Sequence, residues 1–429
     1  MHDAFRQSRK PAQAGRPVEI GNDGNRTGAP QFGTARFLAG HGEYAKAFPH
    51  KRQEAHADIS ATNDQQPPPG KSIGAIFQLS IFHLRDCMSF QVTVQPSGRQ
   101  FTCEEGETIL TAAIRSGVGL PYGCKNGACG SCKGKLLEGS VTHGVHQEKA
   151  LSAAEEDKGL SLFCCATPHS DVVIEAREVL GVGEFPVKKL PTRVAKIDRV
   201  ADDVVVVSLQ LPANERLQYR AGQYLEFILR DGRRRSYSMA NAPHMDDHIT
   251  LHIRHMPGGL FTDHVFANLK ERDILRFEGP FGTFFLREDS DKPMVLLASG
   301  TGFAPIKAIV EHAASTKSEQ PMVLYWGGRR PKDLYMHALC EEWTRSLPNF
   351  RYVPVISEAL PEDNWSGRTG FVHRAVMEDL PDLSGYQVYA CGAPVMVDAA
   401  KRDFTAQCKL PEQEFYADAF TSEADLAKT

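Results

Sequence analysis

The pattern of hydrophobic and polar positions changes abruptly at Met88. Before it, residues 1–87 show no sustained periodicity and contain the linker-like tract QQPPPGK. After it, FQVTVQ alternates apolar and polar residues as a half-buried strand does, and the turn PSGR leads into a second such run, QFTCEE. We therefore expect the functional protein to start at Met88. Residues 1–87 are then either a disordered tail or a non-native extension.

The pattern that follows this predicted hairpin indicates a first domain at residues 88–180. A helix, TILTAAIRSG, is expected to begin at Thr108 and to end at Gly117. KGKLLEGSV and DVVIEAREV are typical of strands, and LSAAEEDKG of a short acidic helix or turn that Ser152 can cap. GVGEFPVKKLP, with its glycines and prolines, is the expected linker at residues 181–190.

Two more domains are predicted after the linker. Residues 191–288 contain strand-like runs such as VVVVSLQL, QYLEFILR and ITLHIRH, with turns between them, which predicts a small antiparallel β-barrel. Residues 289–429 alternate strand and helix, as in MVLLASGTGFAPIKAIVEHAA, which predicts an α/β doubly wound domain with a parallel sheet. The fold class expected from the pattern is therefore multidomain.

Composition and charge narrow the classes of function. The net charge is −4 and no basic block occurs, so nucleic acid is not an expected partner. No apolar run reaches the ~18 residues of a membrane span, so no membrane partner is expected. The chain has 429 residues and ten cysteines, a usage that fits a reducing cytoplasm better than a disulfide-bonded secreted protein. We therefore expect a cytoplasmic protein with several free thiols.

Three of these cysteines stand close together in PYGCKNGACGSCKGKL. Cys124, Cys129 and Cys132 have the spacing C-x₄-C-x₂-C, whereas a structural zinc site prefers two C-x₂-C pairs or a histidine pair. This spacing, with one distant fourth cysteine, is that of a plant-type [2Fe–2S] cluster. The candidates for the fourth ligand are Cys164 and Cys165 in LSLFCCATPHSD.

The glycines of the same loop have a predicted purpose. The cluster carries negative charge on its thiolates, so backbone N–H groups must point at the sulfur atoms. We expect Gly123, Gly127 and Gly130 to adopt positive φ and so to bring those amides close. Lys125 and Lys133 lie on the rim of this loop and are candidates to face an electron acceptor, although lysines there are commonly just solvated.

A ligand site is predicted in the barrel at RRRSYSMAN. In strand alternation, Arg235 can pair with a phosphate, Tyr237 offers a π-face, and Ser238 offers a hydrogen bond at a ring edge. The alternative is a basic surface strand with a core tyrosine. Some twenty residues later, MPGGLFTDHVF places Gly258 and Gly259 before Thr262 at a helix N-terminus suited to a pyrophosphate, unless it is a plain glycine turn. Together the two features indicate one planar, phosphorylated ligand.

A second ligand loop, SGTGFAP, lies at the carboxyl end of the first strand of the α/β domain, where such sheets bind ligands. It is not the G-x-G-x-x-G fingerprint, because Pro305 stands where a further small residue is expected. YACGAP is another loop at a strand end, and its Cys391 can equally be a buried core thiol.

Taken in order, these segments resemble the ferredoxin–NADP⁺ reductase superfamily with an N-terminal plant-type ferredoxin domain. RSYS resembles its flavin motif R-x-Y-S, GTGFAP its nucleotide motif G-T-G-x-x-P, and CGAP its motif C-G-x-P. LFCCATPHSD resembles the segment that carries the last cluster ligand, which implies Cys164. The resemblance covers about Met88 to Phe420. It implies a β-grasp ferredoxin domain, an FAD-binding barrel and an NAD(P)-binding domain.

The resemblance also implies roles for single residues. Arg235 would meet the FAD pyrophosphate, Tyr237 would stack on the flavin, and Ser238 would reach flavin N5. Cys391 would lie near the nicotinamide, and Phe420 would shield the flavin, with Phe415 and Tyr416 as alternatives for that aromatic residue. The further cofactor contacts implied are Ile253, Gly258, Gly259 and Thr262 for FAD, and Gly300, Thr301, Gly302, Pro305 and Gly392 for the nucleotide.

The implied activity is electron transfer from NAD(P)H through FAD and the [2Fe–2S] cluster to a partner protein. FAD is needed because nicotinamide gives two electrons as hydride and the cluster accepts one. RRRSYSMANAP, EGPFGTFF and FYADAF resemble CDP-6-deoxy-Δ3,4-glucoseen reductases, which serve a pyridoxamine-dependent sugar dehydrase, and reductase components of phenol and ring-hydroxylating oxygenases are nearly as similar. A non-catalytic ferredoxin-type carrier is the rival of another class, and it would need only residues 88–180.

The segment GGRRPKD, after the second strand of the α/β domain, leaves the nucleotide preference open. Arg329 and Arg330 can contact the 2′-phosphate of NADPH, hold the ribose of NADH, or point into water. Because the resembling reductases favour NADH, we expect NADH, with NADPH possible.

Overall fold

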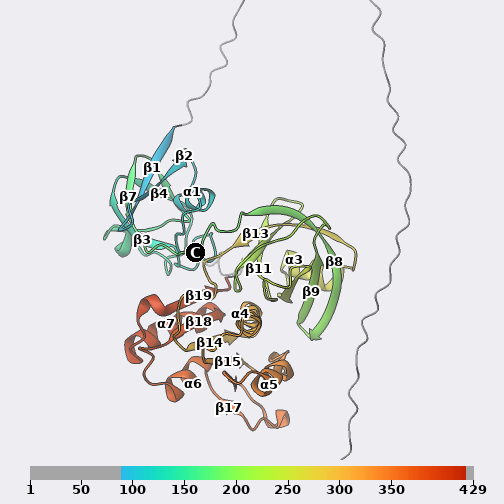
Figure 1. Ribbon diagram of the computed structural model, residues 1–429. Helices are drawn as coiled ribbons and strands as arrows, with labels where there is room; N and C mark the ends of the chain where they lie inside the picture. Colours follow the sequence, from blue (N-terminus) through green and yellow to red (C-terminus); the bar gives the residue numbers. More distant parts are fainter. Residues whose placement is uncertain (1–87, 422–429) are drawn as a thin grey trace, which may run out of the picture. The chain divides into compact units, whose positions relative to one another are not determined.

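The structure, a computed structural model, describes residues 88–421 (Figure 1). The predicted extension at residues 1–87 lies outside the described residues, so its nature stays a prediction.

The first domain is built on the predicted hairpin. Its five-stranded sheet has the order β2-β1-β7-β3-β5, in which β1 and β7 are parallel and the other neighbours antiparallel. Helix α1 starts after Thr108, whose hydroxyl accepts the N–H of Thr111 at 3.3 Å, and Ile109 and Leu110 are buried in the domain core. The elements are β1 (Ser89–Gln95), β2 (Arg99–Glu104), α1 (Ile109–Arg115), β3 (Lys133–Glu138), β4 (Val141–His143), α2 (Ala153–Glu156), β5 (Leu160–Leu162), β6 (Ala166–Pro168) and β7 (Val172–Glu175).

The second domain is the predicted antiparallel sheet. Its strands have the order β11-β10-β13-β8-β9-β12, and a single bridge between Met239 and Leu251 joins the two ends. This closure into a barrel surrounds a core of alternating inward side chains such as Val205, Val207 and Leu209. The elements are β8 (Lys188–Ala201), β9 (Val204–Gln210), β10 (Tyr224–Ile228), β11 (Arg234–Ser238), β12 (His248–Arg254), α3 (Leu260–Ala267) and β13 (Ile274–Phe281).

The third domain is the predicted doubly wound fold. Its six strands are all parallel, in the order β17-β16-β15-β14-β18-β19. Helices α4 and α5 pack on one face and α6 and α7 on the other, so the central strand MVLLAS is buried on both faces (Figure 1). The elements are β14 (Met294–Ser299), η1 (Gly300–Gly302), α4 (Phe303–Ser315), β15 (Met322–Gly328), η2 (Pro331–Asp333), α5 (His337–Ser346), β16 (Phe350–Ile356), η3 (Pro361–Asp363), β17 (Arg368–Thr369), α6 (Val372–Asp379), β18 (Gln387–Gly392), α7 (Pro394–Gln407), η4 (Glu412–Glu414) and β19 (Phe415–Ala419).

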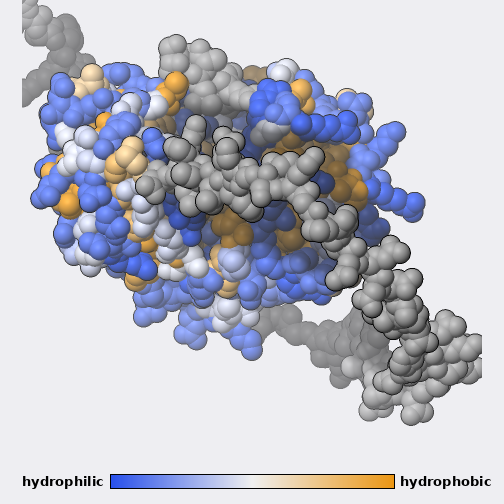
Figure 2. All heavy atoms as spheres, turned by 90° about the horizontal axis from the view of Figure 1, so that it is seen from above, coloured by the Kyte–Doolittle hydropathy of each residue, from blue (hydrophilic) through white to orange (hydrophobic). Residues whose placement is uncertain are grey.

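On the face seen in Figure 2, hydrophilic residues predominate at the surface, and hydrophobic residues form smaller areas between them. Among residues 88–421, no helix is both long and apolar enough to cross a bilayer.

Candidate functional site

The cysteine loop between α1 and β3 folds around the sulfur atoms of its own side chains. The N–H of Cys124 points at Cys129 Sγ at 3.5 Å, the N–H of Cys129 at Cys124 Sγ at 3.3 Å, and the N–H of Ser131 at Cys129 Sγ at 3.5 Å. Hydrogen bonding, first of all from the Cys124 thiol, lowers the pKa of Cys129 to about 5. The same contact raises the pKa of Cys124, so of this pair it is Cys129 whose thiolate, the form in which cysteine binds iron, is stabilised.

Positive φ occurs in this loop at Gly127 (78°) and Gly130 (76°), as predicted, but not at Gly123. The expectation for Gly123 was wrong, and Lys125 takes the left-handed conformation instead, at φ 58°. A Cβ at Gly123 would lie at ordinary contact distance, 3.6 Å from Cys129 Sγ and 3.7 Å from Asp418 Oδ1, so these neighbours do not by themselves require a glycine.

The two candidates for the fourth ligand have different surroundings. The thiol of Cys164 lies against that of Cys132, a contact that raises its pKa to about 12. Cys165 Sγ lies 3.5 Å from the carbonyl oxygen of Val145. Within residues 88–421, no three His, Cys, Asp or Glu side chains converge to hold a single metal ion. The donor set near Cys132 fits a thiolate-held cluster with Cys164 as the fourth ligand, which stays a prediction.

Lys125 does not lie on an open rim, contrary to expectation. Its ammonium forms an ion pair with Glu226 of β10 at 3.0 Å, and burial lowers its pKa. Lys133 pairs with Glu155 of α2 at 2.7 Å. Both lysines are thus paired within the chain, and that they face an electron acceptor stays a prediction.

The predicted flavin residues line the end of β11. Tyr237 packs its ring against Phe227 and Phe261, with ring centres 5.9 and 5.5 Å apart. Arg235 donates from Nη1 to the carbonyl of Arg234 at 2.7 Å. The Ile253 side chain is buried in the barrel core, so this residue has only its backbone to offer a flavin.

In the glycine turn before α3, polar groups that the sequence suggested were open to a ligand already bond to other residues of the chain. The N–H of Gly258 donates to the carboxylate of Asp263 at 3.1 Å, so this amide is already capped. The Thr262 hydroxyl donates to the carbonyl of Met256 at 2.9 Å and braces the turn. A Cβ at Gly259 would lie 2.6 Å from Thr262 Oγ1, which explains the glycine.

The two predicted nucleotide loops, the GTG turn and the CGAP loop, pack closely against each other. A Cβ at Gly302 would lie 2.2 Å from the carbonyl oxygen of Cys391, and one at Gly392 would lie 2.3 Å from Ser299 Oγ. Neither position can accept a side chain, so the GTG turn and the CGAP loop form one continuous backbone surface at the carboxyl ends of β14 and β18. The N–H of Phe420 donates to the carbonyl of Gly392 at 2.8 Å. Tyr416, by contrast, stacks on Tyr389, with ring centres 5.0 Å apart.

Asp418, which the sequence analysis did not single out, joins the two predicted sites. Ser238 Oγ donates to Asp418 Oδ2 at 3.4 Å, and Asp418 pairs in register with Cys391 across β18 and β19. Burial raises the pKa of Asp418 to about 7, and the neighbouring Cys129 adds to the rise. The available signal was an acidic residue within the otherwise apolar run FYADAF.

Arg254 of β12 was also missed. A Cβ at Gly300 would lie 2.9 Å from Arg254 Nη1, so the guanidinium lies directly against the GTG turn. Its Nη2 is buried without a hydrogen-bond partner, and Nε lies 3.2 Å from Asp203. An unpartnered guanidinium nitrogen beside a glycine turn suits a nucleotide phosphate.

Comparison with protein families covers all three domains. The model of the 2Fe-2S iron-sulfur cluster binding domain matches residues 92–169. Those of the oxidoreductase FAD-binding domain and the oxidoreductase NAD-binding domain match residues 191–286 and 296–402. The CDP-6-deoxy-L-threo-D-glycero-4-hexulose-3-dehydrase reductase of Yersinia pseudotuberculosis is 41% identical over 333 residues, spanning 78% of this chain and 99% of that protein. The chain belongs to the NAD(P)H-dependent FAD and [2Fe–2S] reductases.

Other members of this family resemble the chain over the same span. Reductase component 1 of terephthalate 1,2-dioxygenase of Comamonas sp is 36% identical, covering 78% of this chain and 98% of that protein. The crystal structure of the Amycolatopsis cytochrome P450 reductase GcoB superposes with a TM-score of 0.66 at 36% identity, covering 78% and 99%. The reductase thus takes electrons from NAD(P)H and passes them by way of FAD and the cluster to a partner, as the sequence predicted.

Proposed function

We propose that the partner is a sugar dehydrase that acts on a CDP-hexose with a pyridoxamine cofactor, and that NADH is the donor. The 41% identity to a CDP-6-deoxy-hexulose-3-dehydrase reductase, over nearly the whole length of that protein, carries this proposal. A second relative of the same name from Yersinia pestis is also 41% identical. A cytoplasmic location remains part of the proposal.

The residues present fit the three cofactors. Cys124, Cys129, Cys132 and Cys164 would hold the cluster. When bound, FAD supplies the exchange between a two-electron donor and a one-electron acceptor. Ser238, whose hydroxyl donates to Asp418 Oδ2 in this structure, would place its hydroxyl oxygen beside flavin N5.

The nucleotide would lie on the backbone surface made by the GTG turn and the CGAP loop. There the helix N-terminus of α4 and the guanidinium of Arg254 would balance the charge of its phosphates. Phe420, bonded through its backbone to Gly392, would be the aromatic residue nearest the nicotinamide loop.

A reductase component of an oxygenase is the second candidate. It is favoured by the 36% identity to a terephthalate 1,2-dioxygenase reductase component and by the 35% identity to the phenol hydroxylase P5 protein of Acinetobacter pittii. A non-catalytic carrier is not favoured, because it has no use for the domains matched at residues 191–286 and 296–402.

Direct reoxidation tests the choice of partner. The protein is reduced anaerobically with NADH and mixed with a pyridoxamine-loaded sugar dehydrase and its CDP-hexose substrate, or with an oxygenase component. We expect the dehydrase to reoxidise the cluster rapidly. Fast reoxidation by the oxygenase component alone would overturn the proposal in favour of the second candidate.

A further inference from the structure

The loop that follows β15 carries two adjacent arginines, Arg329 and Arg330, at a functional position. β15 lies beside β14 in the parallel sheet, and both strands end at the same edge. β14 ends in the GTG turn. In doubly wound folds the end of the neighbouring strand meets the adenosine ribose, where an acidic residue selects NADH and an arginine accommodates the 2′-phosphate of NADPH.

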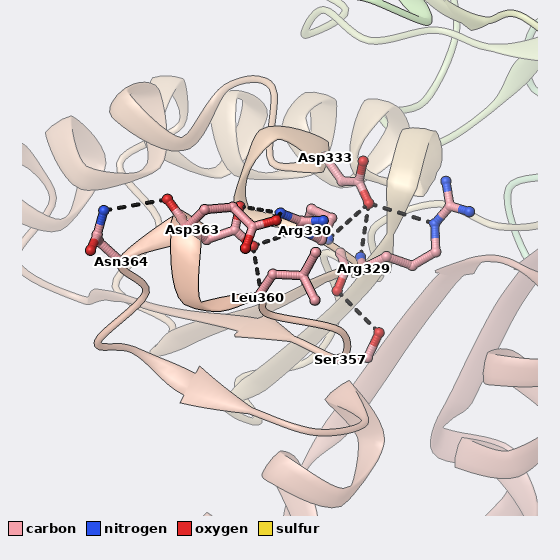
Figure 3. A network of polar contacts seen from close by, with 9 residues as sticks. Arg329, Arg330, Asp333, Ser357, Leu360, Asp363 and Asn364 are labelled. Carbon is pink, nitrogen blue, oxygen red and sulfur yellow. Dashed lines mark hydrogen bonds and ion pairs between the residues drawn. The ribbon is translucent and has the colours of Figure 1, made fainter.

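Arg330 is already bound by an acidic partner of the chain. Its Nε and Nη2 donate to Asp363 Oδ2 and Oδ1 at 2.6 and 2.7 Å, a two-bond fork, and Nη2 also lies 3.3 Å from Glu362 (Figure 3). In Figure 3 the Arg330 and Asp363 side chains point toward one another. These bonds occupy the Nε/Nη2 edge of the guanidinium, so only the two N–H groups of Nη1 are left for a phosphate, and the paired edge is not available for a two-bond contact with it.

Asp363 is held in place by the loop that carries it. Its Oδ2 also accepts the N–H of Leu360 at 2.9 Å. The same loop is pinned to the arginine loop by two backbone bonds, from the N–H of Ser357 to the carbonyl of Gly328 and from the N–H of Glu358 to the carbonyl of Arg329, both 2.9 Å. The ion pair is therefore preorganised, and a nucleotide would have to break it to recruit Arg330.

The nearby acidic residue is engaged elsewhere. Asp333 Oδ2 accepts the N–H groups of Arg329 and Arg330 at 2.9 and 3.1 Å, so it shapes the turn. The Arg329 side chain is 66% exposed, and its Nε lies 3.7 Å from Asp333 (Figure 3). Of the two arginines, Arg329 alone extends into solvent.

We propose that Asp363 is a specificity-determining positioning residue that withholds Arg330 from the nucleotide. Discrimination against NADPH then comes from an internal ion pair, rather than from an acidic residue at the ribose. This inference rests on the proposed use of NADH at this site. It predicts that the loop holds a latent 2′-phosphate site, which appears when Asp363 loses its charge.

The test compares the binding of 5′-AMP and of adenosine 2′,5′-bisphosphate, which differ by the 2′-phosphate, to the FAD- and cluster-loaded protein by calorimetry. In Asp363→Asn, the affinity for the bisphosphate relative to 5′-AMP should rise about tenfold, since Arg330 can then form a charge-assisted hydrogen bond with the 2′-phosphate. The ratio of kcat/KM for NADPH to that for NADH should rise in parallel. Asp382→Asn is the matched control, because it breaks another surface ion pair of this domain, with Lys409 at 2.9 Å.

Arg330→Gln decides the assignment even if Asp363→Asn folds poorly. Alone it should leave both ratios unchanged, and combined with Asp363→Asn it should abolish the gain. A fall in bisphosphate binding in Arg330→Gln, or an unchanged ratio in well-folded Asp363→Asn, would overturn the inference. If NADH still reduces FAD and cluster in these variants, the proposed NADH-dependent function survives that failure.

Discussion

The ammonium group of Lys125 lies 3.5 Å from the centre of the Phe281 ring, so a residue of the cysteine loop is bound to the last strand of the barrel. Glu226, 3.0 Å from the same ammonium, is itself paired with Arg234 at 3.2 Å. Next to this contact, the Tyr224 hydroxyl donates to the carbonyl of Gly123 at 2.8 Å. These bonds hold the predicted cluster loop against β10 and β13, and β10 pairs with β11, the strand of the predicted flavin residues.

Replacing Lys125 by methionine should therefore slow electron transfer to the cluster. Methionine keeps a side chain of similar length beside Phe281 but removes both the ion pair with Glu226 and the cation–π contact. We expect flavin reduction by NADH at the wild-type rate, slower cluster reduction, and a loss of about 2 kcal/mol in unfolding free energy, less than for a fully unpaired buried charge because Arg234 remains. Rapid mixing with NADH separates the two steps. Lys133→Met is the control, and equal cluster reduction in both variants would contradict the role of Lys125.

The cysteine assignment predicts a sharp difference between neighbours. Serine at Cys124, Cys129, Cys132 or Cys164 should remove iron but leave FAD, because each thiolate is a proposed cluster ligand. Serine at Cys165, whose thiol contacts the Val145 carbonyl at 3.5 Å, should leave both. Iron content and the visible spectrum of the purified variants check this, and loss of iron from the Cys165 variant would show that the ligand choice is wrong.

Arg254→Gln should weaken the binding of NADH and NADPH to the same degree. The guanidinium lies against Gly300 in the GTG turn, where it would meet the phosphates that both nucleotides share. We expect KM for each nucleotide to rise about tenfold, the value of a charge-assisted hydrogen bond, with FAD content unchanged. A change in the ratio of the two nucleotides would instead place Arg254 at the 2′ position.

His252 should make stability depend on pH. It is fully enclosed with its Nδ1 2.9 Å from the Tyr335 hydroxyl, and burial lowers its pKa from 6.5 to about 3, with Lys307 adding to the fall. The unfolded chain thus takes up a proton below pH 6.5 that the folded protein refuses, so the stabilisation is present above this pH and is lost as the pH falls toward 3.

Between pH 6.5 and about pH 5 this linkage should cost about 2 kcal/mol of unfolding free energy. Urea unfolding of the wild type and of His252→Gln at both pH values measures it, and the variant should show a smaller loss by that amount. Equal losses in the two proteins would mean that His252 does not remain neutral in the fold.

The local chemistry could be read from the chain alone. The hairpin, the barrel strands and the doubly wound domain could be predicted from the spacing of hydrophobic residues and from turn residues. Both signals involve residues that are near one another in the chain. The same is true of the C-x₄-C-x₂-C loop and of the glycines at 300 and 302. Glycine is the residue that permits a tight backbone approach, so its position in the sequence indicates where such an approach occurs.

What the sequence by itself determined was therefore the order of domains and the kinds of ligand. Tertiary structure decided which charges remain available. Arg330 looks free in the sequence but is bound by Asp363, 33 residues away, and Lys125 is turned inward to Glu226. Asp418 meets Ser238 across 180 residues because β19 and β11 end at the same place. Such pairings depend on strand register and on burial, which set the energy of a charge by its three-dimensional neighbours and not by its neighbours in the chain.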